Sequence, residues 1–293
     1  KGSEWLIDPT DITINNAAST ATNTSNNWAG TGTSAIVNNA SIESALNAGS
    51  SVTVTTASAG TAGGNITLNA NISKTAGSAA NLTLSADRSI TFNANTSITS
   101  SSNALNVNLT AGQSGNNTSN ITFNNNTGIT TNDGTLTISN SAPTTTTGIS
   151  FGTGGGTAAL INLNVGTGSG VISSSGATSA AVSFNSTNVT LSGNMTFSGG
   201  TASTGTGTAG IRFTGNTSES AINVLAGTVN FNGTTTLGSA IAASNNLNTT
   251  VASGAKLNMY GVATGGGGVG FNYTAAALYA GGAGDTLIST NVT

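Results

Sequence analysis

The chain has 293 residues, and only 4% of them are charged, against about a quarter in a typical soluble domain. Five Lys and Arg residues against eight Asp and Glu residues give a net charge of −3, so no nucleic-acid partner is predicted. Cysteine and histidine are both absent, which excludes disulfides, thiolate sites and every Ser-His or Cys-His dyad. Thr, Ser and Asn must therefore make the surface polar.

Residues 1–64 are predicted to form an opening segment that leads into the body of the protein. Residues 15–33 consist mostly of Asn, Thr, Ser and Gly with a lone Trp28, and this composition favours a long polar loop. Residues 41–49 are predicted to form the one helical turn, with Ser41 as its cap, Ile42 and Leu46 on one face, and Gly49 at its end. Because the chain begins at Lys1, we expect it to be a fragment of a longer exported protein.

Residues 65–232 carry short segments in which a branched or aromatic apolar residue alternates with Thr, Asn or Ser. This period of two is typical of a strand with one buried and one wet face. Clear examples run over residues 66–68, 82–84, 90–92, 105–109, 121–123 and 136–138. Gly, Asn, Ser and Ala separate these segments and indicate turns.

Similar segments recur every 22 to 24 residues in the sequence, as from Ile66 to Ile90 and from Leu82 to Leu105. A unit of this length cannot bury its own apolar face, so it must stack on the next unit. The sequence therefore predicts an all-β fold, a right-handed parallel β-helix with three short strands per coil. We expect about a dozen coils and a rod of about 55 to 60 Å at about 4.8 Å per coil. Residues 233–293 are predicted to be looser C-terminal coils of the same rod.

The eight acidic residues are scattered, and no pair lies at equivalent positions one coil apart. Asp87 and Asp133 are 46 residues apart, which is near two periods, so a polysaccharide lyase or glycosidase stays a minor alternative. Asp133 precedes Gly134 and is expected in a turn. No catalytic residue, metal or cofactor is predicted, and the protein is expected not to be an enzyme.

Threonines at like positions suggest a second minor alternative, an ice-binding surface. Thr67, Thr83, Thr91 and Thr122 all lie in strand-like segments, but Asn and Ser share their positions and the coil length varies. No apolar run approaches the 18 or so residues that a membrane-spanning helix needs, so no membrane span is predicted.

Asn-x-Ser/Thr triplets are dense, and many must arise from composition alone. The structural interpretation is that these asparagines stabilise turns and strands, where stacked Asn side chains hydrogen-bond between coils. Glycosylation is possible at the following residues: Asn65, Asn117, Asn216 and Asn232.

Three stretches together resemble one family of bacterial exoproteins. They are residues 5–14, with Trp5 to Pro9 followed by Ile12 and Ile14, residues 40–56, which hold the predicted helical turn, and residues 64–68. This part of the chain is similar to the filamentous haemagglutinin and high-molecular-weight adhesins, which are exported by two-partner secretion. Contact-dependent inhibition proteins share the build. The Asn-Pro-Asn motifs of the family's secretion domain do not occur in this sequence.

The resemblance implies a secreted protein of the bacterial cell surface, associated with the outer membrane and exported through an outer-membrane transporter as its partner. Two functions follow as expectations. In the first, the segment is an adhesin that binds a host receptor, glycan or matrix polysaccharide through polar faces and exposed aromatic residues. The candidate glycan contacts are Trp28, Tyr260, Tyr273 and Tyr279. In the second, the segment is a non-binding stalk that presents a distal adhesive or toxin domain.

Overall fold

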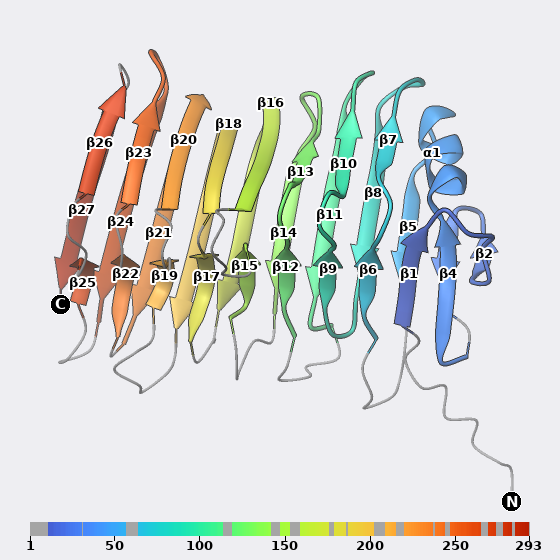
Figure 1. The fold of residues 1–293 in the computed structure, drawn as a ribbon, viewed down its shortest axis with the longest axis horizontal. Helices are drawn as coiled ribbons and strands as arrows, with labels where there is room; N and C mark the ends of the chain where they lie inside the picture. Colours follow the sequence, from blue (N-terminus) through green and yellow to red (C-terminus); the bar gives the residue numbers. More distant parts are fainter. Residues whose placement is uncertain are drawn as a thin grey trace, which may run out of the picture.

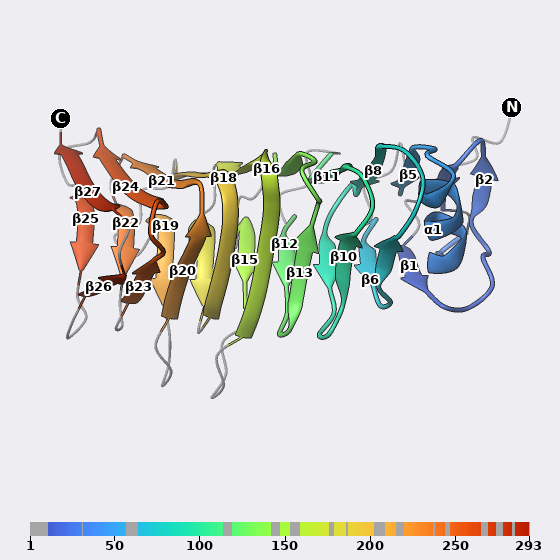
Figure 2. The ribbon, with the colours of Figure 1, turned by 90° about the horizontal axis from the view of Figure 1, so that it is seen from above.

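The computed structural model is built almost entirely of strands that lie across one long axis, with a single helix near the N-terminal end (Figure 1). It describes residues 11–30, 32–56, 64–113, 119–141, 147–152, 159–175, 179–185, 187–201, 209–214, 220–236, 238–243, 247–264, 269–273, 278–282 and 285–292. From β6 on, the coloured strands of each face follow one another along the axis in chain order in both views, whereas β1 lies between β4 and β6 (Figure 1 and Figure 2).

The chain winds through three parallel sheet faces, which we call faces A, B and C. Face A holds, in spatial order, β4 (Ser34–Asn38), β1 (Asp11–Asn15), β6 (Ile66–Leu68), β9 (Ile90–Phe92), β12 (Ile121–Phe123), β15 (Ile149–Phe151), β17 (Ala180–Asn185), β19 (Ala209–Thr214), β22 (Ser239–Ala243) and β25 (Val269–Tyr273).

Faces B and C belong to one larger sheet, because β16 (Ala159–Ser175) and β18 (Thr187–Thr201) run through both. The other face B strands are β7 (Ile72–Lys74), β10 (Ser97–Ser100), β13 (Thr127–Thr130), β20 (Ser220–Ala226), β23 (Leu247–Val251) and β26 (Leu278–Gly282). The other face C strands are β3 (Asn27–Ala29), β5 (Val52–Thr55), β8 (Ala80–Ser85), β11 (Leu105–Ala111), β14 (Leu136–Asn140), β21 (Thr228–Thr235), β24 (Lys256–Ala263) and β27 (Asp285–Val292).

The predicted all-β parallel β-helix with three strands per coil is therefore confirmed. The predicted number of coils is wrong. One position on face A is occupied in turn by Ile66, Ile90, Ile121, Ile149, Val182, Ile211, Ile241 and Phe271, so a coil takes 24 to 33 residues and the chain makes about seven turns. The ten strands of face A, about 4.8 Å apart, span about 43 Å and not 55 to 60 Å.

The coil length predicted from the sequence was too short, because strand-like segments that occupy different registers look alike in sequence. Leu82 pairs with Val107, two residues beyond the predicted partner Leu105. Only the first coil, from Ile66 to Ile90, has the predicted length of 24 residues. The described strands after residue 232 continue the same faces in parallel register.

Inward side chains form stacks along the axis, as the alternation predicts. Phe92, Phe123, Phe151, Phe184 and Phe213 occupy one register position on face A, with neighbouring ring centroids 4.5 to 5.0 Å apart. Phe197 and Phe231 form a second stacked pair from face C at 4.8 Å. All seven of these rings are buried, because the rings of each coil pack against those of the next coil.

The helix α1 (Asn39–Asn47) takes the place of a face B strand beside β7, at the N-terminal end of the rod (Figure 1). It buries Ile42 and Leu46 completely, and it ends at Asn47, with Ala48 as its C-cap and Gly49 next, whose φ of +76° suits glycine. The helix is thus confirmed, but its cap is Asn38 and not Ser41. The Asn38 side chain accepts a hydrogen bond from the backbone N–H of Ser41 at 3.2 Å.

The predicted polar loop over residues 15–33 is corrected in part. β2 (Thr22–Thr24) pairs antiparallel with β3, and β3 continues face C by pairing in parallel with β5. Asn27 and Ala29 point away from the core and Trp28 points into it, because successive residues of a strand face opposite sides. The burial of Trp28 thus accompanies the addition of this stretch to face C.

Candidate functional site

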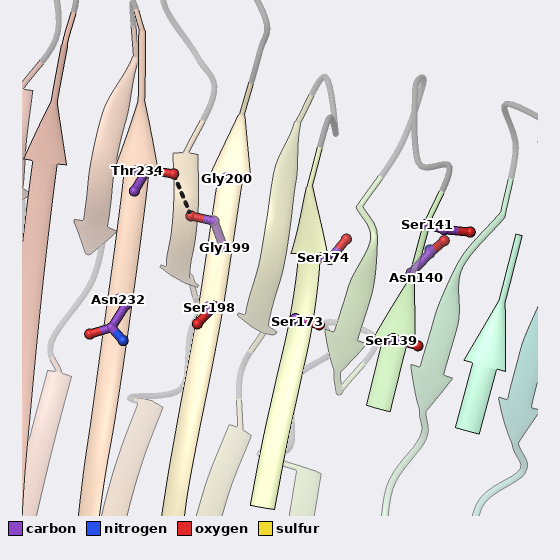
Figure 3. A pocket seen from close by; sticks show the side chains of 10 residues that line it. All are labelled: Ser139, Asn140, Ser141, Ser173, Ser174, Ser198, Gly199, Gly200, Asn232 and Thr234. Atoms are coloured by element: carbon purple, nitrogen blue, oxygen red, sulfur yellow. Dashed lines mark hydrogen bonds between the residues drawn. The ribbon is translucent and has the colours of Figure 1, made fainter. Parts of the chain in front are cut away.

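A shallow groove on the outer surface of face C is the first candidate binding site (Figure 3). It has a volume of about 480 Å³ and crosses four neighbouring strands, β14, β16, β18 and β21. Among the residues that the structure describes, none that lines it is charged. Its lining residues are Ser139, Asn140, Ser141, Ser173, Ser174, Ser198, Gly199, Gly200, Asn232 and Thr234.

One row of outward side chains runs along the groove. Its members are Cα partners on consecutive strands, in the order Ser139, Ser173, Ser198 and Asn232. Each is partly exposed, and none forms a side-chain hydrogen bond among the described residues. The row thus offers free hydroxyl and amide groups about 4.8 Å apart, along the axis of the rod.

Tyr260 continues the same row on the next strand. It is the Cα partner of Asn232, it is 36% exposed, and it provides an aromatic surface beside the end of the groove. Among the four predicted glycan contacts it is the one whose described side chain is exposed. Tyr273 lies on β25 and Tyr279 on β26, but their side chains lie outside the part of the chain that the structure describes.

The expectation that Trp28 is exposed is wrong. Its side chain is only 7% exposed and joins the apolar core, in register with inward-facing Val54. Its buried Nε1 has no hydrogen-bond partner among the described residues. Sequence reasoning treated the surrounding polar residues as a loop and therefore placed the ring on the surface.

The asparagines divide into two groups that sequence alone did not separate. In the first group the side chains bond from coil to coil: Asn106 Nδ2 donates to Asn81 Oδ1 at 2.8 Å, Asn126 Nδ2 to Asn95 Oδ1 at 3.0 Å, and Asn258 Nδ2 to Asn230 Oδ1 at 2.8 Å. Asn65 Nδ2 donates to Asp11 Oδ1 at 2.9 Å, which engages the atom that glycosylation would need. Asn232 lines the groove, whereas Asn117 and Asn216 lie outside the described residues.

The charged residues lie apart from the groove. Asp87 follows β8 at the end of face C, whereas Asp133 lies between β13 and β14, so the two acids occupy different corners of the coil. Asn132 and Asp133 have φ values of +51° and +69°, which confirms the predicted turn. A hydrogen bond of 2.7 Å from the backbone N–H of Thr167 lowers the pKa of Asp133.

Lys74 is the charged side chain that the alternation places inside the rod. It is 0% exposed, and its Nζ donates to the backbone oxygens of Ala76, Gly77 and Ser102. Burial lowers the pKa of Lys74. These contacts tie the corner after β7 to the next coil, which is a structural role that sequence reasoning missed.

Within the described ranges, no group of three or more Asp and Glu residues is placed to hold a metal ion. The single helix found there is too short to cross a membrane. No family model matches the chain, and no match was found among curated proteins or solved structures. The class of protein that the fold defines is thus a parallel β-solenoid with uncharged polar grooves.

Proposed function

We propose that this chain is a segment of a bacterial surface adhesin that binds a neutral glycan along the groove of face C. The observation that carries the proposal is the row from Ser139 to Asn232, whose free polar groups line an uncharged groove and end beside exposed Tyr260. Sugar hydroxyls both donate and accept hydrogen bonds, as do Ser and Asn side chains. An aromatic ring beside such a row suits the apolar face of a sugar ring.

The absence of charge from the groove lining selects the kind of glycan. A sulfated or sialylated chain would have to bring its negative charge to a surface with no Lys or Arg to pair with it. A neutral chain leaves no such charge unpaired. Because the row repeats at each coil, an extended polysaccharide that lies parallel to the rod would meet similar groups several times, and weak contacts would add.

Cellular location and export follow from the resemblance of residues 5–14, 40–56 and 64–68 to two-partner secretion adhesins. The protein would be secreted through an outer-membrane transporter and act at the bacterial surface, in attachment to host cells or to biofilm matrix. Residues 5–10 lie outside the described part, and residues 40–56 contain α1 and β5. Secretion with and without the candidate transporter tests this part of the proposal.

A glycan array with the isolated chain tests the binding function. We expect signals from neutral polysaccharides and none that depend on sulfate or sialic acid. Ser198→Arg should abolish the signal by filling the groove with a long side chain. Thr83→Arg is the matched control, because Thr83 faces outward on β8 of the same face, away from the groove.

A non-binding stalk is the second candidate, and the continuous core favours it. Stacked rings and Asn pairs between coils make a stiff rod without any ligand. Complete silence on the array at high protein concentration would support the stalk and overturn the adhesin proposal for this segment.

A further inference from the structure

A second groove lies on face B, and it begins at β10, one strand beyond β7, which contacts the helix. It has a volume of about 710 Å³ and crosses β10, β13, β16, β18 and β20. Its described lining holds no charged residue and includes Gly128, Leu160, Asn162, Asn188, Thr190 and Asn223.

The groove begins where a ladder of polar contacts stops. Asn71 and Ser97 are bonded between coils, since the backbone N–H of Ser97 donates to Asn71 Oδ1 at 2.9 Å. The next residue along this row is Gly128, which has no side chain to continue the ladder. A side chain there would also clash, because a Cβ on Gly128 would lie 2.5 Å from the backbone oxygen of Asn162. Gly128 therefore keeps the surface hollow at this point.

Beyond Gly128 the asparagines have no partners within the described residues. Asn162, Thr190 and Asn223 follow one another as Cα partners, and Asn188 lies in the neighbouring row. None of these four side chains forms a hydrogen bond there, in contrast to Asn95 and Asn126 in earlier coils. The same residue type that joins coils elsewhere along the rod is thus available to a ligand here.

Leu160 adds an apolar element to this amide cluster. It is 55% exposed, although a leucine is usually buried, and it is the Cα partner of Asn188 on the adjacent strand. The leucine lies about 4.8 Å from Asn188 across the strands and about 6.6 Å from Asn162 along its own strand, so an apolar side chain and two amides are neighbours on the strand lattice.

We propose that the groove of face B binds the acetamido groups of an N-acetylhexosamine oligomer. An acetamido group carries one N–H donor, one carbonyl acceptor and one methyl group. The amides of Asn162 and Asn188, which flank Leu160, match the donor and the acceptor, and Leu160 contacts the methyl group. The uncharged lining suits an acetylated amine and not a free, positively charged one. This site stands independently of the groove of face C.

Calorimetric titration of the full chain with a tetramer of N-acetylglucosamine tests the inference. The comparison ligand is a β-1,4-linked glucose tetramer, which has the same linkage and lacks the acetamido groups. We expect the acetylated tetramer to bind at least about fivefold more tightly, as about one buried methyl group would give. Equal affinities, or no binding of the acetylated tetramer at millimolar concentration, would overturn the proposal.

Two variants on the same strand locate the site. Leu160→Ser should remove the preference for the acetylated tetramer. Val171→Ser is the matched control, because Val171 is also exposed on β16 but lies on face C, and it should leave the preference unchanged. Equal effects of the two variants would overturn the assignment of the site to face B. Tyr260→Ala should leave binding of the acetylated tetramer unchanged, which separates this site from the face C groove.

Discussion

Tyr260 and Asn232 are direct partners on neighbouring strands, so the exposed ring of one lies beside the amide of the other at the end of the face C groove. A sugar that bonds to Asn232 would therefore be placed to stack on Tyr260. This arrangement gives the proposed glycan site both directional contacts and an apolar platform.

Removing that platform should weaken binding to the glycan found on the array. We expect Tyr260→Ala to reduce affinity by about 1 kcal/mol, or roughly fivefold, because the loss of stacking leaves only the polar row. Tyr260→Phe keeps the ring and should retain most of the affinity. Calorimetry measures both, and an unchanged affinity of Tyr260→Ala would remove the ring from the site.

The Asn106 side chain links three coils, and its removal should lower stability. Asn106 donates to Asn81 and accepts from the backbone N–H and the hydroxyl of Thr135, at 2.9 and 3.1 Å. We expect Asn106→Ala to reduce the free energy of unfolding by about 1 to 2 kcal/mol in urea denaturation. Asn108→Ala is the control on the same strand. The side chain of Asn108 accepts one long bond of 3.3 Å from Thr110, so its loss should cost under about 0.5 kcal/mol.

Phe151 lies in the middle of the aromatic stack, and its truncation should open a cavity. Its ring is fully buried between Phe123 and Phe184, with centroids 5.0 and 4.9 Å away. We expect Phe151→Ala to cost about 3 to 5 kcal/mol and Phe151→Leu clearly less. Leu160→Ala, at an exposed position, should stay within about 0.5 kcal/mol of the parent. Equal unfolding midpoints for the first and last variants would contradict the stacked core.

Buried Lys74 should make stability depend on alkaline pH. Burial places the pKa of Lys74 below the ordinary value of 10.5, so in this window the unfolded chain binds the proton and the folded chain does not. The free energy of unfolding therefore rises with pH through the window. Lys74→Met should lack this rise and should also lose about 2 kcal/mol at neutral pH, because three backbone oxygens lose their donor. Urea titrations of both proteins from neutral pH to about 10.5 compare the slopes, and parallel slopes would contradict the assignment.

The sequence predicted the fold well because the same alternation repeats on every face. Pairs such as Ile66 and Leu68 identify a strand by period two alone, whatever its neighbours are. Coil length was harder, since Leu105 and Val107 differ in register but not in character, and only the pairing with β8 distinguishes them. The register of two strands depends on how distant segments pair in the folded protein. In the sequence it is encoded only by the length of the turns between strands, which varies.

The candidate sites were harder to predict than the fold. The sequence named Tyr260 as a candidate together with Trp28, Tyr273 and Tyr279, and only the structure shows that its side chain is exposed. The distinction between Asn106, which is bonded, and Asn188, which has no partner among the described residues, depends on the residue one coil away. Trp28 was misplaced for the same reason, because its burial comes from β3 joining β5.

The coils range from 24 to 33 residues in length, yet Phe123, Phe151 and Phe184 remain stacked. The additional residues of the longer coils lie between the strands. They therefore leave the contacts between stacked rings unchanged. Peptide tags or foreign epitopes inserted at these junctions would therefore be displayed at regular intervals along the molecule. Natural variants of such a chain can likewise change what they present to their surroundings while every stacked ring keeps the same neighbours.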